Sequence, residues 1–268
     1  MTKLWALALS LPLTACTIGD GGGAEPGDGG VTSPVTISES ATWSSTMAID
    51  AITTIAAGVT ITVAPGTEIT IARGKSINVA GTFDAQGTKE LPVTIRAATA
   101  GEHHYGFIIP TGGTLHHAYV KQTGGGIQTT GGTATITDSR MAEADGDWLV
   151  MSGGSVDVQY SQLGQDPGQV DTTHCDLHFD GVLPNTIKVT HSNIGTTPFG
   201  VMFYKGFDAD FTFNNWYDNG TDVATSPGVS GDFSNSWFES NTPPVSGAGA
   251  TLTIDNISAT RLTDAGPR

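Results

Sequence analysis

Residues 136–141 read ITDSRM, and the same six-residue pattern returns along the rest of the chain. It consists of an apolar residue, any residue, a polar or aromatic residue, a small residue, any residue and a second apolar residue. Its instances are LHHAYV from Leu115, ITDSRM from Ile136, VQYSQL from Val158, VTHSNI from Val189, TFNNWY from Thr212 and FSNSWF from Phe233. Their starting positions lie 21 to 23 residues apart, with one longer step of 31. A near-constant interval of this length predicts a solenoid, in which each repeat stacks on the next.

The composition of the repeats indicates which solenoid they form. The segments are short, alternate in polarity and are rich in Thr, Val and Ile, with Gly-Gly, Asp-Gly and Asn-Gly pairs between them. Leucine is too scarce for a leucine-rich repeat, and no segment after the N-terminal apolar run has the pattern of a helix. We therefore predict an all-β fold, a right-handed parallel β-helix with about 21–23 residues per rung. A β-propeller, whose period is roughly 40–45 residues, is the lesser alternative.

The N-terminal part of the repeat region resembles a known group of proteins. GVTITVAPGTEITIARGKSINVAGTFDAQGTKELPVTI, residues 58–95, is similar to the first rungs of bacterial cell-surface right-handed parallel β-helix repeat proteins, which share their fold with pectate lyases. The similarity lies in VAPGT at 63–67, VAGT at 79–82, DAQG at 84–87 and LPV at 91–93. It implies a fold but no particular activity, because this fold carries many functions.

The N-terminus predicts export and lipid anchoring. Residues 1–15 have the pattern of a signal peptide, with Lys3 before an apolar run that is too short to span a bilayer. The signal ends in Leu-Thr-Ala-Cys, which resembles the lipobox of bacterial lipoproteins and implies that Cys16 carries the lipid. A flexible Gly- and Asp-rich tether is expected at 16–33, and one β-helix domain at 34–268. We expect a cell-envelope protein at the outer membrane or cell surface, with its lipid in the membrane.

Charge limits the other partners. The chain has 26 Asp and Glu against 11 Lys and Arg, a formal net charge of −15, which disfavours nucleic acid. The cations are scattered along the sequence, which argues against cleavage of polyuronates, and the residue strings of polygalacturonase-type hydrolases do not occur. No cofactor is expected. Cys175, the single cysteine of the repeat region, is predicted to be an inert core thiol that faces inward with Leu177 and Phe179.

A second strand follows the first in most repeats, and its alignment predicts a core column and an exposed patch. The column contains Ile127, Leu149, Leu177 and Val201, with Thr129, Met151, Phe179 and Phe203 two residues further on. The alternate side chains give a candidate binding patch of Trp148, Val150, Asp176, His178, Asp180, Met202 and Tyr204. Aromatic rings beside carboxyl groups suit a glycan or a protein partner. The insert at 164–174, which makes the 31-residue step, is expected to leave the stack beside this patch.

Several polar residues have the chemistry of metal ligands. Along a strand, His178 lies close enough to Asp176 or to Asp180 to share a metal with it. The pairs at 103–104 and 116–117, two histidines each, point to opposite faces of a strand and offer one ligand each. The acidic turn at 143–147 is of a kind that calcium favours, but it lacks a complete calcium-loop motif.

The third position of the repeat is predicted to form a hydrogen-bonded ladder. It contains His117, Asp138, Tyr160, His191, Asn214, Asn235 and Asn256, one above another. Three asparagines at its C-terminal end are typical of side-chain ladders that satisfy buried polar groups. His117 and Asp138 are expected to pair within it.

Three functions are compatible with these patterns. The preferred one is a lipid-anchored envelope module that acts structurally or binds a glycan or an envelope protein, without a catalytic set. The second is a carbohydrate-active enzyme, a hydrolase or lyase, that acts on a neutral polysaccharide through Asp176, His178 and Asp180. The third is a metal-binding surface protein that uses the same three residues; calcium is a possible ion for the chain, on the basis of the acidic turn.

Overall fold

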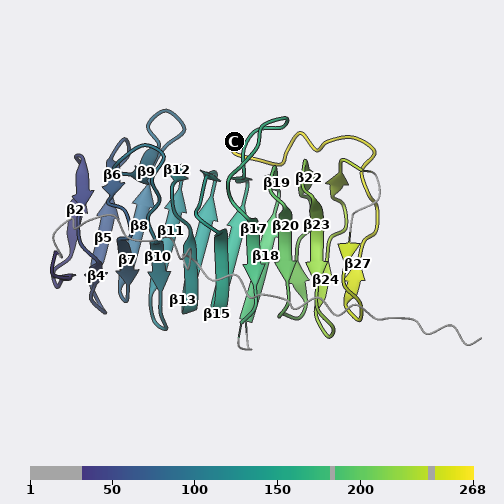
Figure 1. Ribbon diagram of the computed structural model, residues 1–268, viewed down its shortest axis with the longest axis horizontal. Coiled ribbons are helices and arrows are strands. Elements are labelled where there is room, and N and C mark those ends of the chain that lie inside the picture. Colours follow the sequence, from purple (N-terminus) through teal and green to yellow (C-terminus); the bar gives the residue numbers. More distant parts are fainter. Residues whose placement is uncertain (1–31, 182–184, 241–244) are drawn as a thin grey trace, which may run out of the picture.

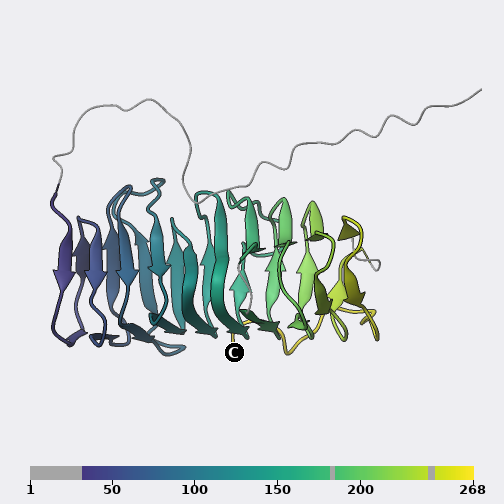
Figure 2. The ribbon, with the colours of Figure 1, turned by 90° about the horizontal axis from the view of Figure 1, so that it is seen from below.

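The computed structural model describes residues 32–181, 185–240 and 245–268, and within them the chain is a parallel β-solenoid of about 10 turns (Figure 1). The view at 90° shows the same single stack, in which successive turns follow the order of the sequence (Figure 2). The predicted all-β parallel β-helix is therefore confirmed. Among the described residues no helix has the length and apolar character needed to cross a membrane. The predicted signal at 1–15, Cys16 and most of the tether lie outside the described residues.

Successive turns add strands to three parallel columns, which we call the first, second and third sheets. The first contains β1 (Val35–Ile37), β4 (Thr53–Ile55), β7 (Ser76–Val79), β10 (Gly106–Ile109), β13 (Ile127–Thr137), β15 (Asp147–Gln159), β17 (Cys175–Phe179), β20 (Phe199–Phe203), β23 (Thr221–Thr225) and β26 (Val245–Ser246). The second contains β2 (Ala41–Trp43), β5 (Thr60–Val63), β8 (Thr82–Gln86), β11 (Thr114–Ala118), the C-terminal parts of β13 and β15, β18 (Asn185–Thr190), β21 (Ala209–Asp210), β24 (Ser230–Asp232) and β27 (Thr251–Thr253). The third contains β3 (Met47–Ile49), β6 (Glu68–Ile71), β9 (Val93–Ala97), β12 (Val120–Thr123), β14 (Arg140–Ala142), β16 (Gln162–Leu163), β19 (Asn193–Gly195), β22 (Asn215–Tyr217) and β25 (Trp237–Phe238).

The register of the first sheet fixes the predicted core column. Ile127 pairs with Leu149, Leu149 with Leu177 and Leu177 with Val201, steps of 22, 28 and 24 residues. All four side chains are fully buried, as are the four residues predicted two positions further on. Burial of such a continuous apolar column is the main force that holds parallel turns together. The column is confirmed, and the longer step comes from the insert at 164–174.

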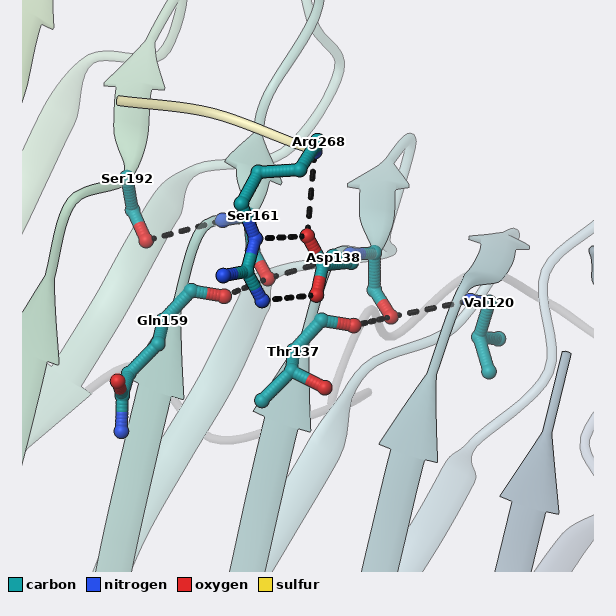
Figure 3. Close-up of polar contacts among 8 residues, drawn as sticks. Val120, Thr137, Asp138, Gln159, Ser161, Ser192 and Arg268 are labelled. Carbon is teal, nitrogen blue, oxygen red and sulfur yellow. Dashed lines mark hydrogen bonds and ion pairs between the residues drawn. The ribbon is translucent and has the colours of Figure 1, made fainter. Parts of the chain in front are cut away.

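A row of left-handed residues and hydroxyl groups forms the corner between the second and third sheets. One non-glycine residue per turn has φ between 48° and 59°, namely Tyr119, Asp138, Tyr160, His191, Phe213, Asn235 and Asn256. The backbone N–H of the residue that follows it donates a hydrogen bond to a side chain of the next turn (Figure 3). The N–H of Val120 donates to Ser139 Oγ at 3.0 Å, that of Ser139 to Ser161 Oγ at 3.3 Å, and that of Ser161 to Ser192 Oγ at 3.1 Å. We call this row the hydroxyl ladder. It satisfies buried N–H groups that the strands leave unpaired.

The hydroxyl ladder corrects the polar ladder expected from the sequence. Asp138, Tyr160, His191, Asn235 and Asn256 do share one row. Asn214 instead belongs to the ladder row, where its side chain accepts from the N–H of Ser192 at 2.8 Å. In the register of the second sheet, His117 stands opposite Ile136, which lies two residues before Asp138. It is buried between the rings of Phe83 and Phe107, and neither of its ring nitrogens has a partner. The expected pairing of His117 with Asp138 is therefore wrong.

The last ten residues run back along the third sheet to the middle of the solenoid (Figures 1 and 2). The backbone of Leu262 exchanges two hydrogen bonds with the Asn215 side chain, and the N–H of Gly266 donates to the carbonyl of His191 at 2.8 Å. At the end of this segment, the guanidinium group of Arg268 donates to the carboxylate of Asp138. We call residues 259–268 the C-terminal strap.

Candidate functional site

The predicted binding patch does not form one surface. Trp148, expected to point outward, is fully buried in the main core. Asp176 is also fully buried, and His178, Met202 and Val150 are 4%, 6% and 8% exposed. Only Asp180 is exposed, and Tyr204 is half-buried. The patch is therefore corrected to a mainly buried group of side chains with two members at the surface.

The alternation fails because the strands are irregular where they enter the first sheet. The pairing matches Asp147 with Cys175 and Leu149 with Leu177, and it skips Trp148 and Asp176. Strict alternation would place residues 147 and 149 on one face. Instead Leu149 joins the core, while Asp147 contacts His178 on the opposite face. Cys175 likewise does not point into the main core with Leu177 and Phe179, as predicted. It packs with Met202 and Ala224 in a small separate cluster.

Asp147 is the centre of the residues that this irregularity brings together. Its carboxylate is 1% exposed and bonds to two imidazoles, His174 Nδ1 at 2.9 Å and His178 Nδ1 at 2.5 Å. His178 is buried and meets the edge of the Tyr204 ring, whereas His174 is 36% exposed and lies against Phe199. We call Asp147, His174 and His178 the His–Asp–His cluster. The alignment of Leu149 with Leu177 already places Asp147 beside Cys175, but period-two alternation would send it into the core.

The electrostatics of the cluster favour an ionised carboxylate. Burial raises the pKa of Asp147, but the hydrogen bonds from His174 and His178 outweigh burial and hold the pKa below its usual value. The hydrogen bond to Asp147 in turn raises the pKa of His174, against the smaller opposing effect of burial. The cluster can therefore hold a proton at the surface through His174. A hydrogen-bonded pair of this kind orients side chains whether or not it performs chemistry.

Two other carboxyl groups are buried on the side of the third sheet. Burial raises the pKa of Asp176 well above its usual value, with a contribution from the charge of Asp171. Its Oδ2 accepts from Thr197 Oγ1 at 3.4 Å and its Oδ1 has no partner. Two turns later, on β23, burial raises the pKa of Asp222 to about 6. Burial likewise raises the pKa of the Cys175 thiol, which donates to the carbonyl of Leu177.

The metal-ligand candidates are separated in space. Asp176 contacts Thr197 while His178 bonds to Asp147, so the expected set of Asp176, His178 and Asp180 does not converge. The side chains of the acidic turn also point apart. The carboxylate of Glu143 accepts from the Gln165 side chain, whereas that of Asp147 points to the two histidines. In the described parts of the chain no group of three His, Cys, Asp or Glu side chains is placed to hold a metal ion.

The histidine pairs point to opposite faces, as predicted. His104 is buried, and burial lowers its pKa to about 4. Its Nδ1 accepts from the N–H of Gly106 at 2.9 Å, which leaves Nε2–H to donate to the carbonyl of Thr123 at 3.2 Å. His103 instead lines a surface cavity. In the second pair His117 is buried and His116 is exposed, 3.7 Å from Asp84.

A surface cavity lies at the loop between β9 and β10. It has a volume of about 370 Å³ and is lined by Arg73, Gly74, Glu102, His103, Tyr105 and Asp145, with Gly101 at its edge. A second cavity of about 220 Å³ shares residues 101–103 and extends along the loop to Arg96, Thr123 and Glu143. Because both cavities are lined by this stretch of the loop, we treat them as one feature, the β9–β10 groove. Sequence reasoning missed it because its residues come from four different loops and strands.

The groove is held in a fixed shape by backbone contacts with both neighbouring turns. The N–H of Tyr105 donates to the carbonyl of Lys75 at 2.8 Å, and that of His104 to Gly124 at 2.8 Å. Gly74, with φ of 66°, lies under the Tyr105 ring, where a Cβ would stand 3.9 Å from that ring. Tyr105 keeps 41% of its surface exposed. The groove therefore presents an aromatic ring with two arginines, a histidine and three carboxyl groups in its lining.

Comparisons with protein-family models, with curated proteins and with solved structures find no match.

Proposed function

We propose that the protein is a lipid-anchored binding module of the cell envelope, and that the β9–β10 groove holds a glycan. The lipobox-like ending at Cys16 and the Gly-rich tether support attachment of a rigid solenoid to a membrane surface. The observation that carries the binding role is the exposed ring of Tyr105 in a cavity of about 370 Å³, with Arg73 and Asp145 around it. A sugar ring stacks its apolar face on an aromatic ring while its hydroxyls bond to charged neighbours.

Oligosaccharide binding by the purified full-length protein tests this role. Neutral and charged oligosaccharides on a glycan array would select a ligand, and titration calorimetry would measure its affinity. Tyr105→Ala should weaken binding by roughly tenfold or more, because the stacking surface is lost. Phe207→Ala is the matched control, because Phe207 is 55% exposed and lies outside the groove. Equal affinities of the Tyr105→Ala variant and the wild type would refute the groove as the binding site.

A polysaccharide hydrolase is the second candidate, because Glu102 and Asp145 line the same cavity. Glycosidases cleave between two carboxyl groups, one of which supplies a proton. The carboxyl groups whose pKa burial raises, Asp176 and Asp222, lie outside the groove, which favours binding over cleavage. A reducing-end assay on the bound glycan separates the two roles. New reducing ends that disappear in Glu102→Gln or Asp145→Asn would make the protein an enzyme.

A further inference from the structure

Four of the eleven Lys and Arg residues gather around one cavity. Its volume is about 210 Å³, it lies where β9 and β12 begin, and its cations are Lys89, Lys121, Arg140 and Arg268. They come from three successive turns and from the C-terminal strap, so their distance in the sequence hides their proximity. We call this cavity the cationic pocket. In a chain with a net charge of −15, such a concentration of positive charge is unusual and costs self-repulsion.

Two of the four cations have their charge satisfied within the protein. Arg268 pairs with Asp138 at 2.8 Å, and Arg140 pairs with Asp166 at 3.1 Å. The ion pairs among the described residues include neither Lys89 nor Lys121, both of which are exposed. The pocket therefore offers two ammonium groups without an ion pair among the described residues, while the one carboxylate in its wall, that of Asp138, is already paired with Arg268.

The register of the third sheet increases this excess of charge. Lys121 on β12 pairs directly with Arg140 on β14. Like charges opposite one another on neighbouring strands destabilise a sheet, and an anion between them removes that repulsion. This cross-strand pair is therefore an arrangement that a bound anion would stabilise.

The rest of the pocket wall consists of Thr88, the carboxylate of Asp138 that pairs with Arg268, and four apolar or aromatic residues. Pro92, Pro267 and Val120 supply the apolar part of the wall, and the half-buried Tyr119 adds a ring. Pro267 belongs to the C-terminal strap, which the Arg268–Asp138 pair fixes at the pocket edge (Figure 3). A ligand with an anionic group and a compact ring fits both parts of this wall.

We propose that the cationic pocket binds a phosphorylated sugar, with its phosphoryl group between Lys89, Lys121 and Arg140. A phosphate monoester has a charge of about −1.5 to −2 near neutral pH, which matches two unpaired ammonium groups better than a single carboxylate does. The sugar ring packs on Tyr119 and the prolines. The pocket lies at the opposite end of β9 and β12 from the β9–β10 groove, so this site does not depend on the function proposed for the groove.

Calorimetry on the full-length protein, with glucose 6-phosphate as the probe, tests the site. Lys89→Ala combined with Lys121→Ala should weaken binding by about tenfold or more, because both unpaired charges are removed. Lys188→Ala is the matched control, because this lysine lies on β18 and pairs with Asp157. Unchanged affinity in the double variant would overturn the proposal, as would equal losses in the double variant and the control.

The comparison ligands identify the group that is bound. Glucose and glucuronate should bind at least about tenfold more weakly than glucose 6-phosphate if the dianion provides the affinity. Inorganic phosphate that bound as tightly as the sugar phosphate would overturn the role of the apolar wall. Phosphatidylcholine vesicles with and without phosphatidic acid test the lipid source of the same chemistry. Capture by the phosphatidic acid vesicles alone, without binding of glucose 6-phosphate, would overturn a soluble sugar as the ligand.

Discussion

The guanidinium group of Arg268 binds the carboxylate of Asp138, 130 residues earlier in the chain, through Nε at 2.9 Å and Nη2 at 2.8 Å (Figure 3). The N–H of Arg268 donates to the same carboxylate at 3.1 Å, and the guanidinium carbon lies 3.8 Å from the centre of the Tyr160 ring. Planar pairing and ring stacking are both specific to arginine. These contacts hold the end of the C-terminal strap against the middle of the solenoid.

Removal of this contact should release the strap. Arg268→Ala leaves the carboxylate of Asp138, which is 4% exposed, without its charged partner. We expect the free energy of unfolding to fall by roughly 1–2 kcal/mol. Amide hydrogen exchange at 262–268 should become faster than in Lys205→Ala, an exposed control without an ion pair among the described residues. Unchanged exchange at these amides would show that Arg268 does not hold the strap.

The His–Asp–His cluster predicts a pH-dependent stability difference between the wild type and Asp147→Asn. The lowered pKa of Asp147 adds stability that is present above about pH 3.9 and is lost as the pH falls through the folded pKa. The raised pKa of His174 adds stability that is present below about pH 6.5 and is lost as the pH rises through the folded pKa. The wild-type advantage should therefore be largest between about pH 4 and pH 6.5, at roughly 2 kcal/mol.

Urea unfolding of both proteins from pH 4 to pH 8 measures that difference. Titrating groups outside the His–Asp–His cluster affect both proteins alike and cancel in the comparison. A difference that stays constant over this range would contradict the electrostatic account of the cluster.

The buried His117 is expected to lower the stability of the folded protein as the pH falls. Burial lowers its pKa to about 3, and both ring nitrogens lack partners. The unfolded chain binds a proton below about pH 6.5 that the folded chain cannot, so the wild type loses up to about 1.4 kcal/mol per pH unit below that value. His117→Leu removes the loss and should be the more stable protein at pH 5. Parallel stability curves for the two proteins would indicate that His117 finds a partner.

Thiol counting tests both cysteine predictions in one assay. Cys175 is buried and the pKa of its thiol is raised, so a thiol reagent should not modify it in the native protein. In denaturant the mature protein should show one reactive thiol if Cys16 is acylated, because the chain has two cysteines. Two thiols after denaturation would refute lipidation of Cys16, and a reactive native thiol would refute burial of Cys175.

The sequence was sufficient to predict the stack and its core column, because apolar burial repeats in every turn. Leu177 and Val201 are buried as expected, and their partners follow from the interval. The predicted patch failed at Trp148 and Asp176, where the strands depart from alternation as they enter the sheet. Period two assumes a regular strand, and no residue pattern at this point indicates the irregularity.

The surface sites were beyond sequence reasoning for a different reason. The cationic pocket joins Lys89 to Arg268, and the β9–β10 groove joins Arg73 to Asp145. Such contacts depend on the path of loops and of the strap, whose lengths differ from turn to turn. The cations that are scattered along the sequence therefore form a group only in the folded chain.

The hydroxyl ladder has a consequence for how this protein could change over generations. Ser139 and Ser161 stand 22 residues apart, Ser161 and Ser192 stand 31 apart, and their bonds are nearly the same at 3.3 and 3.1 Å. The additional residues were accommodated at another corner without disturbing the phase of the serines. Insertions and deletions at that corner can therefore accumulate freely, and new recognition surfaces can arise there while the winding of the solenoid stays constant.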